Sequence, residues 1–501
     1  MFAATLRTSM PRTAARAAAQ RTTAVAHHLM STAAASPAPE QEPTVLFESN
    51  GSLRTYILNR PKKLNALDEP MLSILRPKIE EWSASDLCGT IVGRGNGRAF
   101  CSGGDVASVV QNASDPATIP HAIDYFKREF EMDYILAALK KPYVAVLDGM
   151  TMGGGVGLAA NAPFRIATEK TVFAMPETKI GYCPDVGASY FLSRMDGELG
   201  TYLALTSDTL SGRAVFEHGL ATHYIPSRRI PLLLDRLAEL DKPHASVIDR
   251  TLEDLSAERE PTEAAPPFVG AKRAALDHAF RHNTVERIVA DLEAYAAQGE
   301  DAEVKQWASD TLALLHLRSP TSLKVSLEAI RRGKRQTLFK ALEMELKIAT
   351  AFCRGASPDF LTGVKAVLVT KSKDKPEWSP TSLKEVTPEI LSRFFDPQSP
   401  YLADAPKLDF PEEQTSAKLG NPLKYALPTE EEIASVVIGS HGSAGGNLGL
   451  RFEEVVARFA ELRGGKLGVK EKVTEVVNRR CELTDNADGN FVWLKWKHLP
   501  K

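Results

Sequence analysis

Short apolar and β-branched runs alternate with helical periodicity from residue 44 to about residue 227. The strand candidates are bounded by Gly, Asn or Pro and cover residues 45–47, 53–59, 90–92, 143–147 and 164–167. Between them, apolar residues recur at helical spacing over residues 68–83 and 121–140. This alternation predicts an α/β fold in which helices cover a sheet.

The pattern becomes almost entirely helical from residue 231 to about residue 351. Charged amphipathic stretches at residues 285–297 and 337–351 are typical of helices that pack by one face. We therefore expect an α/β core at residues 44–230, followed by a helical extension at residues 231–396.

A proline-rich stretch at residues 397–411 predicts a linker to a C-terminal appendage, residues 397–501. The appendage contains one clear amphipathic helix that ends at two glycines. Its apolar face is predicted to carry Phe452, Val455, Val456, Phe459 and Leu462. The glycine-rich residues 439–449 lack the residue order of a phosphate-binding loop, so a flexible loop is expected there.

The first 43 residues are predicted to be a mitochondrial presequence and a linker. Arg7, Arg12, Arg16 and Arg21 stand among Ala, Ser and Thr, and no acidic residue precedes Glu40. The predicted location is therefore the mitochondrial matrix. A disordered tail with no targeting role would have a similar composition and is the alternative.

Composition and charge narrow the classes of function. The chain has 501 residues, 43% hydrophobic and 25% charged, which indicates a globular protein with a substantial core. A net charge of -2 provides no broad basic field, so nucleic-acid binding by the chain alone is not expected. No apolar run approaches the roughly 20 residues of a membrane span. The five cysteines form no C-x-x-C pair, so neither a disulfide framework nor a zinc site is indicated.

Two glycine-containing motifs carry the chemistry. Residues 99–105 read Ala-Phe-Cys-Ser-Gly-Gly-Asp, and residues 141–157 pass from a strand into Gly153-Gly154-Gly155 at the start of a helix. Glycines at a helix start let a ligand oxygen reach backbone N–H groups. With a second donor from Gly103-Gly104 they predict an oxyanion hole, in which each donor lowers the barrier by about 3 kcal/mol. The alternative is that the glycines only permit close packing.

Cys101 and Cys183 lie inside these motifs and suggest a nucleophile. No histidine stands beside either in the sequence to act as a base, which disfavours cysteine catalysis.

Together with Met175-Pro-Glu-Thr-Lys-Ile-Gly-Tyr-Cys-Pro-Asp185, these motifs resemble the crotonase superfamily over residues 44 to about 371. The resemblance implies a spiral of ββα units with a helical C-terminal extension, to which this chain adds the appendage. It also places the oxyanion donors on the backbone N–H groups of Gly104 and Gly154. The segment Asn59-Arg-Pro-Lys-Lys-Leu-Asn-Ala66 helps to hold CoA in this superfamily, which implies CoA contacts for Arg60, Lys62, Lys63, Asn65 and Ala66.

Within the superfamily, hydratases usually carry a glutamate two residues after the glycine triplet, where this chain has Gly157. Loss of that carboxylate removes one half of the acid/base pair that adds water to a double bond. The motifs are instead similar to those of the 3-hydroxyisobutyryl-CoA hydrolases. The implied reaction is hydrolysis of that acyl-CoA thioester in valine breakdown, with CoA as part of the substrate and no separate cofactor.

The resemblance implies a site made of Glu129, Gly154, Glu177 and Asp185. Glu177 would attack the thioester directly or activate water. Asp185 would orient Glu177 or the substrate's 3-hydroxyl, which Glu129 would help to hold. Acid assistance is hardly needed, because a thiol with a reference pKa of about 8.5 leaves readily. For Glu129 the alternative is a solvated helix face, since Lys127, Arg128, Glu131 and Asp133 surround it.

Other functions remain open at this stage. Mitochondrial relatives with a comparable tail are constituents of the small subunit of the mitochondrial ribosome, which suggests a structural role with or without retained catalysis. An enoyl-CoA isomerase or a dehalogenase of the same fold is a further alternative. The oligomeric state is not determined by the sequence, and a homo-oligomer stays open.

Overall fold

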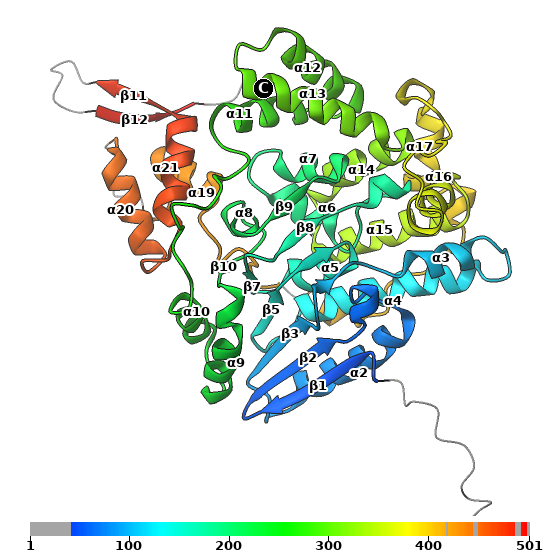
Figure 1. Cartoon of the computed structure of the whole chain (residues 1–501), viewed down its shortest axis with the longest axis horizontal. Coiled ribbons are helices and arrows are strands. Elements are labelled where there is room, and N and C mark those ends of the chain that lie inside the picture. The colour runs from blue at the N-terminus through cyan, green and yellow to red at the C-terminus, as the bar shows by residue number, and fades with distance from the viewer. Residues whose placement is uncertain (1–41, 417–418, 444–448, 486–491, 498–501) are drawn as a thin grey trace, which may run out of the picture. The chain divides into compact units, whose positions relative to one another are not determined.

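A computed structural model describes residues 42–416, 419–443, 449–485 and 492–497 (Figure 1). The predicted presequence lies outside the described residues, as does part of the predicted loop at residues 439–449. The chain divides into two units, and the description below concerns the second, Thr44–Lys501.

Two sheets form the centre of the described structure. The first has the strand order β1-β2-β3-β5-β7-β10, and the second has the order β4-β6-β8-β9. The strands are β1 (Val45–Asn50), β2 (Leu53–Leu58), β3 (Thr90–Gly95), β4 (Ala99–Cys101), β5 (Tyr143–Leu147), β6 (Met150–Met152), β7 (Phe164–Ala167), β8 (Val172–Ala174), β9 (Thr209–Ser211) and β10 (His223–Tyr224). All neighbours pair in parallel except β1 with β2 and β8 with β9.

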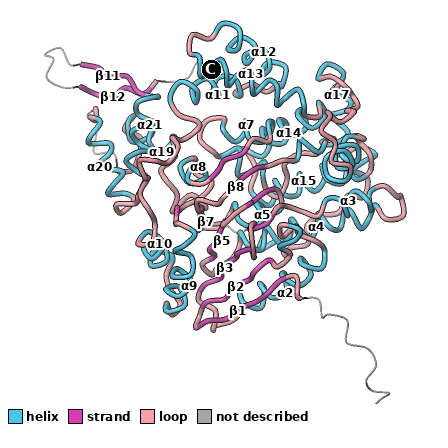
Figure 2. The backbone as a smooth tube through the Cα atoms, in the orientation of Figure 1, coloured by secondary structure: helices cyan, strands magenta, loops and turns pink. Residues whose placement is uncertain are grey.

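The chain visits the two sheets in turn. It passes from β3 to β4, from β5 to β6 and from β7 to β8, and each pair of strands is followed by at least one helix (Figure 2). Parallel strands require such crossovers. The helices that precede β10 are α2 (Glu69–Ala84), α3 (Val106–Ala113), α4 (Ile119–Ala137), α5 (Gly154–Ala160), α6 (Ala188–Phe191), α7 (Leu199–Thr206) and α8 (Arg213–Glu217). The predicted α/β class and the spiral of ββα units are confirmed.

Helices dominate the chain after β10, as the periodicity predicted. They are α9 (Ile230–Glu239), α10 (Ala245–Glu253), α11 (Gly270–Phe280), α12 (Val285–Gln298), α13 (Ala302–Leu317), α14 (Pro320–Gly333), α15 (Leu338–Cys353), α16 (Asp359–Val364) and α17 (Pro388–Phe395). Several begin at a side-chain cap: Asp301, Ser319 and Thr337 each accept a hydrogen bond from a backbone N–H of the first turn. These capping residues mark where the helices begin, so the starts of the helices can be recognised in the sequence.

The six-stranded sheet is covered on both faces. Val92, Val144 and Ile166 pack with Leu233 and Leu252 of α9 and α10 in one apolar cluster. The alternate residues of the same strands belong to the larger cluster that contains α2, α4 and α15. Burial on both sides is what parallel sheets require, and it explains why these strands read as continuous apolar runs.

The five predicted strands are all present, but the short strands of the second sheet escaped the sequence pattern. β4, β6 and β8 have three residues each, and β4 and β6 lie within the glycine-containing motifs. A three-residue strand is too short to show a period of two.

The C-terminal segment is packed against the rest of Thr44–Lys501. It contains α18 (Glu412–Ser416), α19 (Glu430–Val437), α20 (Phe452–Leu462), α21 (Val469–Arg480), β11 (Cys481–Asp485) and β12 (Val492–Trp496). Helix α21 contacts α11 (Figure 1), and Val473 and Val476 are fully buried. The proline-rich stretch 397–411 also packs: the ring of Phe410 lies 4.9 Å from that of Tyr134.

For one residue in this segment, the prediction that it belongs to the apolar face is wrong. Val455 and Phe459 are buried, and Phe452 and Val456 are half-buried against the core. Leu462, however, is 40% exposed. It is the last residue of α20, one turn beyond the buried Phe459.

Candidate functional site

The first predicted donor, Gly104, lies in the turn between β4 and α3. The turn is fixed to the segment after η1 (Pro61–Lys63), because the N–H of Leu67 donates to Gly103 and the N–H of Asp105 donates to Leu67. Gly103 has φ +107°, which favours glycine over residues with a Cβ. Among the described residues no backbone carbonyl accepts from the Gly104 N–H.

The second predicted donor, Gly154, is the first residue of α5. Its preceding residue, Gly153, has φ 46° and ψ -122°, so the chain turns sharply from β6 into the helix. A first-turn N–H has no partner within its helix, and no backbone carbonyl of the described chain accepts from this one. The positive end of the α5 dipole also lies here.

The two glycines lie side by side. A Cβ at Gly154 would be 3.3 Å from the Gly104 nitrogen and 2.1 Å from Oε1 of Glu129. A Cβ at Gly153 would be 2.9 Å from Oε1 of Glu177. The structure therefore brings both predicted donors and both predicted glutamates to one place, and any side chain at Gly154 would collide with Glu129.

Glu129 lies on α4 and is 2% exposed. The Tyr125 hydroxyl is 3.3 Å from its Oε1 and 3.1 Å from the Leu67 carbonyl oxygen. The alternative of a solvated helix face is wrong, because Glu131 and Asp133 are buried as well. Glu131 is neutralised by Arg76 and Lys127 at 2.5 and 2.6 Å, so its burial is paid for by charge pairing.

Glu177 begins the 3₁₀ turn η2 (Glu177–Ile180), which follows β8. It is 6% exposed, and its Oε2 has no hydrogen-bond partner among the described residues. Burial, opposed in part by a backbone hydrogen bond, and the nearby Glu129 and Glu345 raise the pKa of Glu177 to about 8. Burial also raises the pKa of Glu129 to about 8.

Asp185 lies in the loop between η2 and α6 and is also buried. The Tyr182 hydroxyl donates to its Oδ2 over 2.9 Å. Burial, followed by the charges of Glu129, Glu177 and Glu345, raises the pKa of Asp185 well above its ordinary value. The three carboxylates predicted from the sequence thus influence one another electrostatically.

Sequence reasoning missed two buried carboxylates beside these. Glu345 of α15 accepts hydrogen bonds from the N–H groups of Gly187 and Ser189 at 2.6 and 2.9 Å and from the Ser189 hydroxyl. It thereby holds the loop that follows Asp185, and burial raises its pKa to about 7. The one signal in the sequence is that Glu345 stands on a helix face whose other residues are apolar.

The second missed carboxylate, Asp133, lies one helical turn after Glu129. Neither of its oxygens has a hydrogen-bond partner in the described chain. A Cβ at Gly157 would be 2.7 Å from its Oδ2 and 2.6 Å from Cβ of Val186. The position that holds a glutamate in hydratases therefore has no room for a side chain here.

The predicted CoA segment divides into buried and exposed residues. Arg60 pairs with Asp68 and Asp105 at 3.1 and 3.2 Å. The amide of Asn65 donates to the carbonyls of Asn96 and Ala99, so it holds the turn beside the glycines. The partly buried Ala66 accepts from Arg60, whereas Lys62 and Lys63 are exposed.

Cys101 and Cys183 are buried, and burial raises the pKa of the Cys101 thiol to about 12 and that of Cys183 well above its ordinary value. Both are therefore protonated thiols, which are poor nucleophiles. The described parts of the chain contain no cluster of His, Cys, Asp or Glu suited to a metal ion. They also contain no helix with the length and apolar character of a membrane span.

Comparison with known proteins connects this geometry to two kinds of relative. The small ribosomal subunit protein mS47 of Neurospora crassa is 41% identical over 479 residues, covering 92% of this chain and 89% of the relative. The mitochondrial 3-hydroxyisobutyryl-CoA hydrolase of Homo sapiens is 37% identical over 377 residues, covering 75% of this chain and 93% of the relative.

The solved structures give the same fold. A carnitinyl-CoA dehydratase from Mycobacterium thermoresistibile aligns with a TM-score of 0.63 and 32% identity, covering 72% of this chain and 98% of that one. The family model for enoyl-CoA hydratase/isomerase matches residues 53–395, which include the glycines and carboxylates described above. The chain belongs to the enoyl-CoA hydratase/isomerase family, the crotonase superfamily.

Proposed function

We propose that this chain hydrolyses 3-hydroxyisobutyryl-CoA to 3-hydroxyisobutyrate and CoA. One observation carries the proposal. The backbone N–H groups of Gly104 and Gly154, which no carbonyl of the described chain accepts from, lie beside the buried carboxyls of Glu129 and Glu177. The likeness to the human hydrolase supports the choice of substrate.

The two N–H groups are proposed to bind the thioester carbonyl oxygen. As the acyl carbon becomes tetrahedral, negative charge develops on that oxygen, and two fixed donors stabilise it. The N-terminal end of the α5 dipole adds to the effect. Both donors are backbone groups of buried turns, so little reorganisation accompanies the reaction.

Glu177 is proposed to deliver the oxygen that replaces the thiol. Its carboxylate either attacks the acyl carbon, forming an anhydride that water then cleaves, or takes a proton from the water that attacks. CoA leaves as a thiolate, which needs little acid assistance, so the proposal requires no cofactor beyond the CoA of the substrate. Asp185 and Glu129 are proposed to orient the 3-hydroxyl.

The test is thiol release by the purified full chain from 3-hydroxyisobutyryl-CoA, with crotonyl-CoA and acetyl-CoA as comparison substrates. We expect free thiol to be released from 3-hydroxyisobutyryl-CoA. We expect none of the three substrates to be hydrated. Hydration of crotonyl-CoA without thiol release would overturn the proposal. After a single turnover in ¹⁸O-water, label in Glu177 establishes direct attack with cleavage of the anhydride at the glutamyl carbonyl, because general-base catalysis leaves no label in the protein.

A second role in the small subunit of the mitochondrial ribosome is favoured by one observation. The match to mS47 covers 92% of this chain and so extends into the C-terminal segment, whereas the match to the human hydrolase covers 75%. The relatives named as mitochondrial support that location, and we propose the matrix as the compartment.

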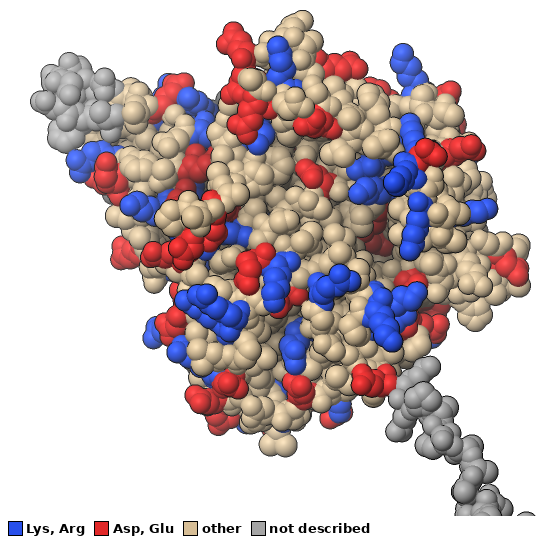
Figure 3. All heavy atoms as spheres, viewed as in Figure 1, with Lys and Arg blue, Asp and Glu red and all other residues tan. Residues whose placement is uncertain are grey.

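Charges on the face seen in Figure 3 are of both signs and interspersed, which supports the prediction that the chain alone does not bind nucleic acid. Any ribosomal association would then depend on the assembled particle. Sedimentation of mitochondrial extract tests it: co-migration with the small subunit at moderate salt is expected. Recovery only as a free protein would overturn the second role and would give the size of any homo-oligomer.

A further inference from the structure

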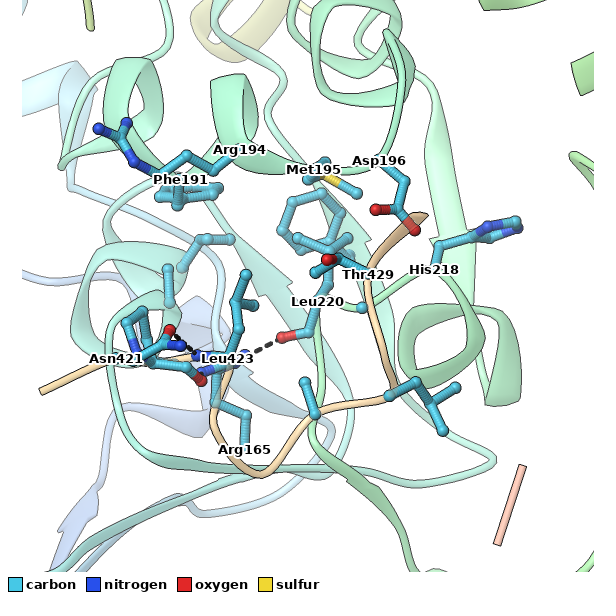
Figure 4. A pocket seen from close by; sticks show the side chains of 18 of the residues that line it. Arg165, Phe191, Arg194, Met195, Asp196, His218, Leu220, Asn421, Leu423 and Thr429 are labelled. Atoms are coloured by element: carbon cyan, nitrogen blue, oxygen red, sulfur yellow. Dashed lines mark hydrogen bonds between the residues drawn. The ribbon is translucent and has the colours of Figure 1, made fainter. Parts of the chain in front are cut away.

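The C-terminal segment closes a cavity against the spiral core. The cavity has a volume of about 330 Å³, within the range of small-ligand sites. One wall is formed by α5 and the neighbouring sheet, and the opposite wall by residues 419–429 of the C-terminal segment (Figure 4). It therefore exists only because this chain continues beyond the family's domain.

Most of the lining is apolar. The apolar lining includes Val156, Ala159 and Ala160 of α5, Leu423 of the C-terminal segment, and Phe191 and Leu220. Dry apolar walls favour a ligand with a hydrocarbon body.

The exception at one end is Arg165 of β7. Its side chain is 2% exposed, and its Nε and Nη1 donate to the carbonyl oxygens of Leu220, Ala162 and Pro422. No acceptor among the described residues receives a hydrogen bond from Nη2, and no described carboxylate forms an ion pair with the guanidinium. Burial alone lowers its pKa to about 10, so the group remains charged at neutral pH.

The charges at the other end of the cavity are already paired. Lys472 lies 2.7 Å from Asp196, whose second oxygen accepts from the N–H of Glu430. Figure 4 shows Asp196 and Arg165 well separated, with Leu220 between them. Arg194 also lines the cavity and has no carboxylate partner in the described chain, but it is half-buried and its guanidinium donates to the carbonyl oxygens of Tyr190, Gly333 and Gln336. Since buried charges are normally paired, Arg165 is the fully buried cation of this cavity that lacks a counter-ion among the described residues.

We propose that this cavity binds a small monocarboxylate with an apolar tail, held by a charge-assisted hydrogen bond from Nη2 of Arg165. A guanidinium matches a carboxylate in geometry and charge, and the apolar walls match the tail. The site is separate from the proposed thioester site. The residues of α5 that line it are Val156, Ala159 and Ala160, whereas the N-terminal Gly154 of the same helix adjoins Glu129.

Isothermal titration calorimetry of the full chain with sodium hexanoate tests the proposal, with hexanamide as the uncharged probe of equal size. We expect one hexanoate per chain and at least about tenfold weaker binding of hexanamide, because a charged hydrogen bond is lost. Saturating CoA in a repeat titration identifies competition with the proposed thioester site.

Two variants attack the cavity from different sides. Arg165→Gln removes the charge and keeps a donor for the carbonyls, and Ala160→Leu fills the cavity without touching Arg165. Each should weaken hexanoate at least about tenfold. Arg213→Gln is the matched control, since Arg213 is also buried but pairs with Glu263 at 2.5 Å outside this cavity.

The proposal is overturned if hexanoate does not bind, if hexanamide binds equally well, or if CoA displaces hexanoate. It is also overturned if Ala160→Leu, folded with unchanged thiol release, binds hexanoate like the unmodified chain. Loss of binding in both cavity variants, with binding retained by Arg213→Gln, supports it.

Discussion

Two groups of buried and half-buried carboxylates in Thr44–Lys501 have opposite surroundings. The acidic cluster at the proposed thioester site consists of Glu129, Asp133, Glu177, Asp185 and Glu345. None of them forms an ion pair in the described chain. Hydroxyl or N–H groups are the partners of Glu129, Asp185 and Glu345, whereas Asp133 has no hydrogen-bond partner among the described residues. The paired interface, where α19 and α21 meet the core, consists of Asp196, Asp277, Glu430 and Glu475 with Arg273, Lys472, Arg479 and Arg480.

The pKa shifts follow from this difference. In the acidic cluster, burial raises the pKa of every carboxyl, and like charges raise most of them further. At the paired interface burial acts in the same direction, but Lys472 and Arg273 hold the pKa of Asp196 below its ordinary value, and Arg479 does the same for Glu475. Carboxylates that are paired with a cation stay ionised and stabilise the fold. Buried carboxyls without a cation have raised pKa values and can exchange protons near neutral pH, which catalysis requires.

The largest expected effect comes from Glu177→Gln, which keeps the shape of the side chain and removes the carboxylate. Thiol release should fall by about 10³-fold, because a base or nucleophile contributes on this scale. The measurement is the rate of thiol release from 3-hydroxyisobutyryl-CoA. Glu453→Gln, on the exposed side of α20, should release thiol at the normal rate. Undiminished hydrolysis by Glu177→Gln would remove this residue from the mechanism.

The second effect is expected at the paired interface. Arg479→Met removes a cation shared by Asp277, Glu430 and Glu475. Arg273 still pairs with Asp277 and Arg480 with Glu430, so the variant should cost about 2 kcal/mol in the free energy of unfolding, from the lost charged hydrogen bonds. Urea unfolding measures it. The matched control is Arg451→Met, because Arg451 pairs with Glu454 on the surface and should cost less than about 1 kcal/mol. Equal costs would show that the interface contributes no more than a surface pair.

The same contrast explains which features the sequence could predict. Gly104, Gly154, Glu177 and Asp185 stand in contiguous motifs whose chemistry can be argued locally. Glu345 lies 156 residues after Ser189, to which it bonds, so only the folded chain shows that it holds the Asp185 loop. A carboxylate on a helix is usually solvated, and that expectation failed for the whole run from Glu129 to Asp133.

The C-terminal segment was harder still. Its charged residues read as solvated helix faces, because their partners lie far away in the sequence. Arg479 reaches Asp277 across 202 residues, and Lys472 reaches Asp196. Of these helices only α20 was predicted from its period. Helix α21, which carries Lys472 and Arg479, was not predicted, and the surface that receives it depends on how α11 packs.

The third effect concerns the pH dependence of catalysis. Because the carboxylate of Glu177 is the active form and its pKa is raised to about 8, kcat/KM should rise about tenfold per pH unit below pH 8 and then level off. Thiol release measured from pH 5.5 to 9.5 gives the profile. A flat profile above pH 6 would show that Glu177 titrates as an ordinary carboxyl and that its burial has no catalytic consequence.

The smallest effect is expected for Asp133→Asn, which tests what an unpaired carboxylate costs. Burial and then Glu129, Asp185 and Glu345 raise the pKa of Asp133, so the folded chain holds a proton that the unfolded chain has already released. The stability that this proton gives is complete below the ordinary pKa of about 3.9 and is lost as the pH rises through the raised value. Asn does not titrate, so the stability of the variant relative to the unmodified chain should be higher at pH 9 than at pH 5, by at least about 1 kcal/mol.

Thermal unfolding at the two pH values measures the difference between the variant and the unmodified chain. Asp196→Asn is the informative counterpart, because Asp196 has a lowered pKa and pairs with Lys472 at 2.7 Å. Its stabilising charge is present above the ordinary pKa, so this variant should be less stable than the unmodified chain at both pH values. If the stability of Asp133→Asn relative to the unmodified chain does not rise from pH 5 to pH 9, the two groups of carboxylates do not differ in the way that their partners indicate.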